Sequence, residues 1–233
     1  MEVNVVLVHS PIVGPNTWAP VSRELRRRDI RTIVPTLPSI IEKSTPIWTQ
    51  HVQGVAKRLE AISNNQPIVL VGHSGAGPLL PAINAYSPHP IAAYIFVDAS
   101  LPHGGKSRLE EMEASSSSLA SSLRDHLEAG RLFPEWTDKD LSEIIPDGFR
   151  QGILAEIRPM GLSFFEESMP YYPNWSDIPC GYIKFSQAYT DPAEKAQSYG
   201  WRYDEFDAGH FHMLVEPKAV SDSLSNLIKL LCP

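Results

Sequence analysis

The chain has 233 residues, of which 42% are hydrophobic, and its formal net charge is −7. That length suits a single domain with a sizeable core. The acidic balance argues against a nucleic-acid partner, because such binding depends on clustered Lys and Arg, and no apolar run reaches the roughly 18 residues that a membrane span needs.

Strands and helices alternate in the first part of the chain. Residues 3–10 (VNVVLVHS) contain the uninterrupted apolar run VVLV (5–8), which is typical of a strand buried on both faces. Apolar residues then recur at helical spacing and alternate with further apolar runs. These patterns predict helices over 18–25 and 48–62 and strands over 29–38, 67–73 and 91–99.

Residues 99–179 break this pattern. They contain helix-like segments at 107–130, 137–146 and 147–160 and no convincing strand. Because a structureless loop of this length is uncommon in a compact domain, we predict an inserted helical cap. The four serines at 115–118 predict an interruption of its first helix.

The strand-and-helix pattern returns after the cap, with strands predicted at 181–187 and 201–206 and a closing helix at 220–231. Alternating units of this kind predict an α/β fold with a mostly parallel sheet flanked by helices. Residues 1–98 and 180–233 would form its core, and 99–179 the cap.

The N-terminus, the cysteines and the charge pattern bear on the location of the protein and on metal binding. The N-terminal stretch has no basic segment and no cleavage-type site, so we expect a cytoplasmic protein in which Cys180 and Cys232 are reduced thiols. No CxxC or HExxH spacing occurs, and we expect no metal site. Five arginines between positions 23 and 31 have helical spacing, which indicates a solvated helix face.

The stretch IVLVGHSGAG (68–77) carries the strongest chemical signal. A strand leading into a serine among small residues is typical of a nucleophile elbow, in which the serine sits on a tight strand-to-helix turn. Ser74 is therefore the predicted nucleophile. The fifth position of the GxSxG pattern is Ala76, which is still small, and Pro81 should kink the following helix.

A serine hydroxyl needs a base to become a good nucleophile. The loop DAGHFHMLVEP (207–217) follows the last predicted strand and precedes the last helix, where it can return a histidine to Ser74. It offers His210 and His212.

Four stretches in this order, LVHSPIVGPNTW, GHSGAG, FVDASLP and GHFHMLVEP, resemble the α/β-hydrolase superfamily, nearest its small branch of hydroxynitrile lyases and plant methylesterases. The resemblance covers nearly the whole chain, although the cap matches only in length and helicity. In that branch the base stands seven residues before a proline, which points to His210. The resemblance implies an α/β-hydrolase fold, hydrolysis of an ester or related acyl bond by a Ser-His-Asp triad, a small-molecule substrate and no cofactor.

The oxyanion hole departs from that family. Relatives have His-Gly or His-Thr at the end of the first strand, followed by a residue that donates its N–H. Here the residues are His9, Ser10 and Pro11, and proline has no N–H. Gly75 N–H can still donate, and the second donor would be Ile12 N–H or the Ser10 hydroxyl.

The acid of the triad also departs from the family. The usual aspartate position falls on Ala188, and Asp191 follows three residues later. Asp191 precedes a proline and has the features of a helix N-cap, whereas Asp98 ends a buried strand at the carboxyl edge of the sheet, where ligand sites gather. We predict that Asp98 is the acid, with Asp191 as the alternative and Asp207 as the third candidate.

Two rival functions remain. Hydroxynitrile lyases of this branch carry Thr where Ser10 stands, so Ser10 and Ser74 could hold an alcohol while His210 moves its proton, without an acyl-enzyme. The same fold could also serve as a non-catalytic receptor for a small ligand. The pattern sets neither the substrate nor the oligomeric state.

Overall fold

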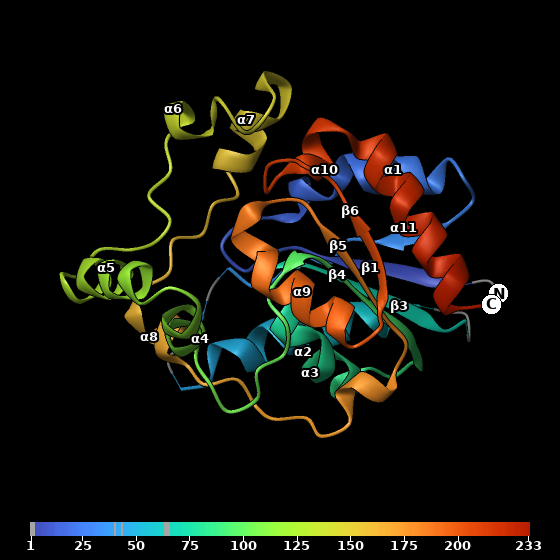
Figure 1. Ribbon diagram of the computed structural model, residues 1–233, viewed down its shortest axis with the longest axis horizontal. Coiled ribbons are helices and arrows are strands. Elements are labelled where there is room, and N and C mark those ends of the chain that lie inside the picture. Colours follow the sequence, from blue (N-terminus) through green and yellow to red (C-terminus); the bar gives the residue numbers. More distant parts are fainter. Residues whose placement is uncertain (1–2, 40, 43, 63–65) are drawn as a thin grey trace.

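The computed structural model describes residues 3–39, 41–42, 44–62 and 66–233. Its centre is a six-stranded sheet in the order β2-β1-β3-β4-β5-β6, and all neighbouring strands are parallel (Figure 1). The predicted α/β class is therefore confirmed. The strands are β1 (Asn4–Val8), β2 (Arg31–Ile33), β3 (Ile68–Ser74), β4 (Ile91–Ala99), β5 (Cys180–Lys184) and β6 (Arg202–Glu205).

Helices flank both faces of this sheet. The α-helices are α1 (Ala19–Arg26), α2 (Ile47–Leu59), α3 (Leu80–Tyr86), α4 (Arg108–Ser115), α5 (Ser117–Glu128), α6 (Asp138–Leu141), α7 (Asp147–Leu154), α8 (Leu162–Glu166), α9 (Thr190–Ser198), α10 (His212–Val215) and α11 (Pro217–Leu231). Short 3-10 helices are η1 (Pro15–Thr17), η2 (Gly77–Leu79), η3 (Trp175–Asp177) and η4 (Gln187–Tyr189).

The alternation of side chains along β1 shows how the two layers form. Val5 and Leu7 belong to the hydrophobic cluster that contains residues of α1 and α11, whereas Val6 and Val8 belong to the cluster that contains residues of α2 and α3. Successive strand side chains point to opposite faces, so a strand covered on both sides is apolar on both. All five β1 residues are buried; Val5 to Val8 are apolar, and the side chain of Asn4, at the start of the strand, donates to Gln66 O at 3.4 Å.

Two predictions about the core need correction. The strand predicted over 29–38 pairs only at Arg31–Ile33, because Pro35 and Pro38 cannot donate to a ladder. Pro81 does not kink the helix after Ser74. The chain runs first through η2, α3 begins only at Leu80, and Pro81 lies in its first turn, where the missing N–H has no helical partner to lose.

The segment predicted as a cap contains α4 to α8, which lie at the left and top of Figure 1. The serine patch interrupts the first helical stretch as predicted: Ser116, with extended backbone, separates α4 from α5. A small apolar cluster of its own holds part of this segment together, with Leu109, Leu127, Phe164 and Phe165 at its centre. Its independence from the core as a structural unit stays a prediction.

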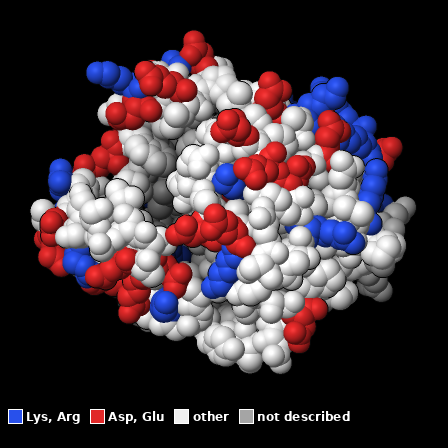
Figure 2. Space-filling model, in the orientation of Figure 1, with Lys and Arg blue, Asp and Glu red and all other residues white. Residues whose placement is uncertain are grey.

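Basic side chains gather on one side of the molecule, although the formal net charge of the chain is −7. Lys and Arg side chains gather at the upper right of Figure 2, on the side where Figure 1 places α1. Arg23 and Arg26 are exposed residues of α1, as predicted, but the helix ends at Arg26, and Arg31 already belongs to β2, so the predicted helix face is only partly correct. Arg28 pairs with Asp222 of α11, and Arg26 donates to the Thr32 hydroxyl. Within the described ranges, none of the helices is long and apolar enough to cross a membrane. Cys180 and Cys232 are both buried, free thiols.

Candidate active site

The carboxyl ends of the parallel strands bring the predicted site residues together. Ser74 is the last residue of β3, and Asp98 is next to last in β4. Ser10 follows β1, and His210 follows β6. In an open parallel sheet this edge is where ligand sites form.

Ser74 occupies the sharp turn expected of a nucleophile elbow. Its φ is +57°, in the left-handed region that side chains other than glycine rarely adopt. Space beyond the turn is tight: a Cβ built on Gly77 would lie 2.0 Å from the carbonyl oxygen of Ser100. Glycine at position 77 therefore allows the chain after Ser74 to pass close to the chain after β4.

Asp98 lies at an irregularity of β4. His73 pairs with Val97 and Ser74 pairs with Ala99, so Asp98 is an extra residue, and its φ is +42°. Bulges of this kind redirect a side chain out of the regular pleat. The carboxylate is fully buried and accepts hydrogen bonds from Phe185 N–H (2.8 Å), Ser186 N–H (2.9 Å) and the Ser186 hydroxyl (2.6 Å).

His210 is the fourth donor to this carboxylate. Its Nδ1 lies 2.7 Å from Asp98 Oδ2. Burial by itself raises the pKa of the Asp98 carboxyl, but the hydrogen bond and charge of His210, together with the bonds from Ser186, outweigh it and hold the pKa below its usual value. Because an ionised carboxylate can only accept, Nδ1 carries the proton, and Nε2 of the neutral ring keeps its lone pair.

The hydroxyl of Ser74 is paired with a residue that the sequence did not suggest. Ser74 Oγ lies 3.0 Å from the hydroxyl of Tyr189, and within the described residues it makes no hydrogen bond to His210. The Tyr189 ring is stacked on the imidazole of His210, with centroids 5.0 Å apart and planes 9° from parallel. Tyr189 stands next to Ala188, and that proximity was the only signal in the sequence.

Two buried histidines hold the loops around these groups, and sequence reasoning assigned them no role. His73 stacks on His210 and donates from Nε2 to the His210 carbonyl oxygen at 3.1 Å. His9 donates from Nδ1 to Ser10 O (2.8 Å) and accepts from Leu37 N–H (3.3 Å). Burial lowers the pKa of both, that of His9 to about 4, so both are neutral at pH 7.

The loop after β1 approaches Ser74 from the side opposite to Tyr189 and His210. A Cβ built on Gly75 would be 3.5 Å from Ser10 Oγ and 3.6 Å from Pro11 Cδ. Neither the Ser10 hydroxyl nor the N–H of Ile12 has a hydrogen-bond partner within the described part of the chain, whereas Ile12 O accepts from Arg158 N–H. Both predicted second donors are thus unengaged, and the Ser10 hydroxyl is the one shown close to Gly75.

Other sequence candidates lie apart from His210. Asp191 is an exposed residue in the first turn of α9. The prediction that it caps this helix is wrong, because α9 begins one residue earlier, at Thr190. Asp207 is exposed, and His212 packs against Phe185 and Phe206. In the described residues none of the three bonds to Ser74 or His210.

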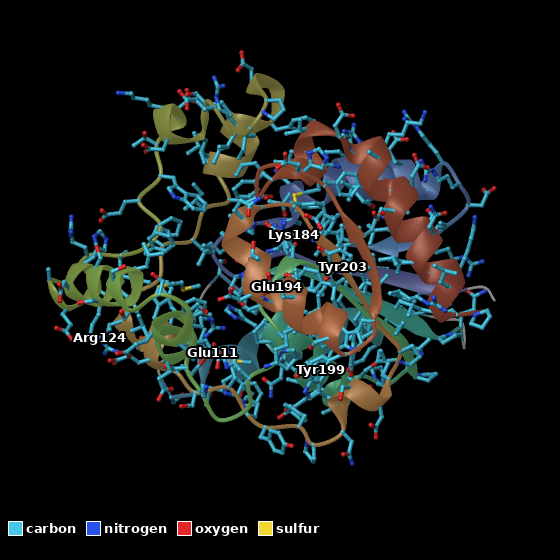
Figure 3. All side chains as sticks on the ribbon, in the orientation of Figure 1. Glu111, Arg124, Lys184, Glu194, Tyr199 and Tyr203 are labelled. Atoms are coloured by element: carbon cyan, nitrogen blue, oxygen red, sulfur yellow. The ribbon has the colours of Figure 1, made fainter. Side chains whose placement is uncertain are left out.

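A cavity of about 600 Å³ opens above Ser74 between the core and the cap segment. Ser10, Ile12, Gly75 and Tyr189 line it from the core, and Leu119 and Phe164 line it from the other side. Figure 2 shows a hollow left of centre between these two parts. Glu111 of α4, which Figure 3 labels, also lines the cavity. The described side chains include no group of three His, Cys, Asp or Glu that could hold a metal ion.

Known proteins share this architecture. An extracellular alpha/beta-hydrolase from a Paenibacillus species, described as structurally and functionally homologous to tobacco salicylic acid binding protein 2, is 18% identical, with a TM-score of 0.75 over 97% of this chain and 98% of its own. Tomato methylketone synthase I is 14% identical, with a TM-score of 0.74 over 99% of both chains. A pyrethroid hydrolase from Sphingobium faniae is 16% identical, with a TM-score of 0.72 over 97% of this chain and 98% of its own.

At these identities the structural likeness establishes the fold alone. No curated protein sequence matches the chain. Residues 5–223, however, match the model of the alpha/beta hydrolase family, which is well over half of the chain. The chain therefore belongs to the alpha/beta hydrolase family, as its motifs predicted.

Proposed function

We propose that this protein hydrolyses the carboxylic ester, or a related acyl bond, of a small organic molecule, with Ser74, His210 and Asp98 as its catalytic triad. One observation carries the proposal. The strained turn at Ser74, which lines the cavity, and the hydrogen-bonded pair His210–Asp98 lie at the same edge of the sheet. Tyr189 connects them, because its hydroxyl bonds to Ser74 and its ring stacks on His210. The membership of a hydrolase family and the name of the pyrethroid hydrolase among the similar structures agree with hydrolysis.

In the first half of the reaction, Ser74 Oγ attacks the ester carbonyl while Nε2 of His210 takes the hydroxyl proton. Asp98 stabilises the imidazolium that forms and keeps the proton on Nδ1. For this step Ser74 Oγ must exchange its bond to Tyr189 for one to Nε2. Catalytic hydrogen bonds commonly tighten only when substrate is bound, so the resting geometry is compatible with the step.

The tetrahedral intermediate places negative charge on the former carbonyl oxygen. Gly75 N–H, directly after the nucleophile, would stabilise it from the side of the β1 loop. Pro11 cannot assist, and the unengaged Ile12 N–H and Ser10 hydroxyl are the candidates for the second donor. Loss of the alcohol leaves an acyl group on Ser74, which water, activated by His210, then hydrolyses.

The cavity favours a substrate with an apolar part. Leu119, Phe164 and Phe165 contribute apolar wall, and Ser74 and Ser10 are polar groups on the core side. Charged side chains also line the cavity: Arg108, Glu111, Asp191 and Lys195. Pockets of this kind bind small organic molecules by burying apolar surface and orient them with a few polar contacts.

A labelling experiment and a kinetic experiment test the proposal together. We expect a fluorophosphonate probe to label the wild-type protein at Ser74 only, and p-nitrophenyl acetate to be turned over with a burst. Ser74→Ala should abolish labelling and lower kcat by about a million-fold, the scale seen when a serine nucleophile is removed. Labelling that survives in Ser74→Ala would refute the assignment of the nucleophile.

One observation favours a second candidate. The Ser10 hydroxyl shares the cavity with Ser74 and has no partner among the described residues, as a lyase that holds an alcohol between two hydroxyls would require. A lyase of this kind forms no acyl-enzyme. The burst with p-nitrophenyl acetate therefore separates the two: a burst supports the hydrolase, and cyanohydrin cleavage without a burst supports the lyase.

A further inference from the structure

The hydroxyl of Tyr189 touches the nucleophile, and no step of the triad mechanism uses it. We propose that Tyr189 is a further catalytic residue, which donates a hydrogen bond to the oxygen of the departing alcohol. The inference rests on the hydrolysis proposed above, because it assigns a role within that reaction.

The order of the strands indicates which oxygen Tyr189 serves. β1 lies on one side of β3, and β4, β5 and β6 lie on the other. The candidate oxyanion donors belong to the β1 side, where Ser10 Oγ approaches Gly75. Tyr189 follows β5, and His210 follows β6, so both approach Ser74 from the opposite side.

That arrangement orients the substrate. When the carbonyl oxygen points to Gly75 N–H, the leaving-group oxygen must face His210, which protonates it. Tyr189 is stacked on His210, and its hydroxyl is 3.0 Å from Ser74 Oγ. In the tetrahedral intermediate the leaving-group oxygen is bonded to the same carbon as Oγ, so it lies within reach of this hydroxyl.

Tyr189 has the chemistry that this role needs. Burial raises the pKa of its phenol to about 12, against a smaller opposing effect of the bond to Ser74, so the hydroxyl keeps its proton at neutral pH. The backbone N–H of Tyr189 donates to Ser186 O, and Ser186 is itself bonded to Asp98. The donor is therefore attached to the same loop that holds the acid.

The step is balanced without any further reagent. The bond between the carbonyl carbon and the leaving oxygen breaks, its electron pair stays on that oxygen, and the Nε2 proton of His210 neutralises the alkoxide. Tyr189 keeps its own proton and only donates a hydrogen bond while charge develops. An alcohol leaves, the acyl group stays on Ser74, and nothing is oxidised or reduced.

The test uses two esters that differ only in their leaving group. We would measure kcat/KM, which covers all steps through alcohol release, for p-nitrophenyl butyrate and phenyl butyrate. Tyr189→Phe keeps the ring that stacks on His210 and removes only the hydroxyl. For the phenyl ester we expect a loss of about 10- to 100-fold, the effect of losing one hydrogen bond to a developing charge. For p-nitrophenyl butyrate, whose anion leaves without help, we expect less than about 3-fold.

Two variants serve as matched controls. Tyr199 follows the last residue of α9, at the opposite end of the helix that Tyr189 precedes, and its side chain is exposed (Figure 3). Tyr199→Phe should therefore leave both rates unchanged. Ser10→Ala, on the oxyanion side, should change both esters by the same factor, because stabilisation of the carbonyl oxygen does not depend on the leaving group.

Equal losses on both esters in Tyr189→Phe would overturn the proposal and place the hydroxyl at the oxyanion or in a structural role. Unchanged rates on both esters would overturn it as well. In either case fluorophosphonate labelling and turnover by the wild type would leave the hydrolase function standing. A wild-type protein that is neither labelled nor acylated would overturn the proposed function and this inference together.

Discussion

The edge of the sheet and the segment 99–179 meet at the same cavity, but they are built differently. At the edge, Asp98 is fully buried, held by four hydrogen bonds and placed by a bulge, and Ser74 is fixed in a left-handed turn. The segment joins the short helices α4 to α8 by irregular stretches, and it leaves Leu119 64% exposed. We infer that the edge sets the reaction and that the segment sets which molecules enter it.

The largest effect should follow from removing the charge of Asp98. Asp98→Asn keeps the size of the side chain but removes the acceptor that fixes the proton on Nδ1 of His210. We expect kcat to fall about 10,000-fold, as in a triad that loses its tautomer-fixing acid. Steady-state kinetics on p-nitrophenyl acetate measures this.

Asp191→Asn is the matched control, because Asp191 also borders the cavity but is exposed and lies in the first turn of a helix. It should retain kcat and lose at most about 1 kcal/mol of stability, from its interaction with the helix dipole. An inactive Asp191→Asn beside an active Asp98→Asn would show that the resting contact does not identify the acid.

The next effect concerns the backbone of the edge. A methyl group added in Gly77→Ala would meet the carbonyl of Ser100 at 2.0 Å, so the turn must open, at a cost of about 3 kcal/mol or more. Gly75→Ala makes the same chemical change where the nearest atoms are 3.5 and 3.6 Å away, and it should cost under about 1 kcal/mol. Urea unfolding of both variants compares them, and equal losses would show that the chain around Gly77 gives way easily.

Much of the edge was predictable because periodic patterns report burial. The strand at Ile91–Ala99 was predicted at both bounds, and Asp98 was singled out because a carboxylate that ends a buried strand needs a partner. Its bulge was not predictable, because a ladder irregularity depends on the neighbouring strand rather than on local sequence. Pro81 was misjudged for a related reason: the 3-10 turn at Gly77–Leu79 delays the start of the helix.

The contact between Tyr189 and Ser74 could not be predicted from the sequence. The strand predicted over 181–187 stops at Lys184, and the chain then forms a short 3-10 turn before α9. The direction of the Tyr189 side chain depends on that turn and on the position of His210, which lies on a distant loop. In the segment 99–179 helices were predictable, but their packing over the cavity depends on a few contacts far apart in sequence, such as Arg108 over Phe164.

A pH-dependent effect arises where helix α2 of the core touches the segment 99–179. His51 of α2 lies against Phe164 of α8, and neither ring nitrogen has a partner among the described residues. Burial, and next the charge of Arg108, lower its pKa to about 3, while an unfolded histidine titrates near ~6.5. As the pH falls below the unfolded pKa of ~6.5, only the unfolded chain gains a proton, so folding stability drops by up to about 1.4 kcal/mol per pH unit.

His51→Leu removes this penalty while keeping an apolar contact with Phe164. Relative to its effect at pH 8, the variant should gain about 2 kcal/mol of stability at pH 5. Urea unfolding at both values measures the difference. Buried His9 also lowers folding stability at acid pH, but it does so in the wild type and in His51→Leu alike, so its effect cancels in the comparison. A difference that does not change between pH 8 and pH 5 would show that His51 titrates alike in the folded protein and in the unfolded chain.

The smallest effect should come from the wall of the cavity. Leu119 lies on α5, borders the cavity and is 64% exposed, so Leu119→Ser should change the free energy of unfolding by less than about 0.5 kcal/mol. It removes apolar surface that a long acyl chain can cover. We therefore expect KM for p-nitrophenyl octanoate to rise about 3- to 10-fold, less than full burial of a leucine would give.

Leu132→Ser makes the same change at another exposed leucine of the segment, which does not line this cavity, and it should leave KM unchanged. With p-nitrophenyl acetate, whose acyl group is too short to reach the wall, both variants should match the wild type. A fall in kcat for both esters in Leu119→Ser, with KM unchanged, would mean that α5 acts on the transition state itself. The division of labour between the edge and the segment 99–179 would then fail, because an interaction made only in the transition state lowers kcat rather than raising KM.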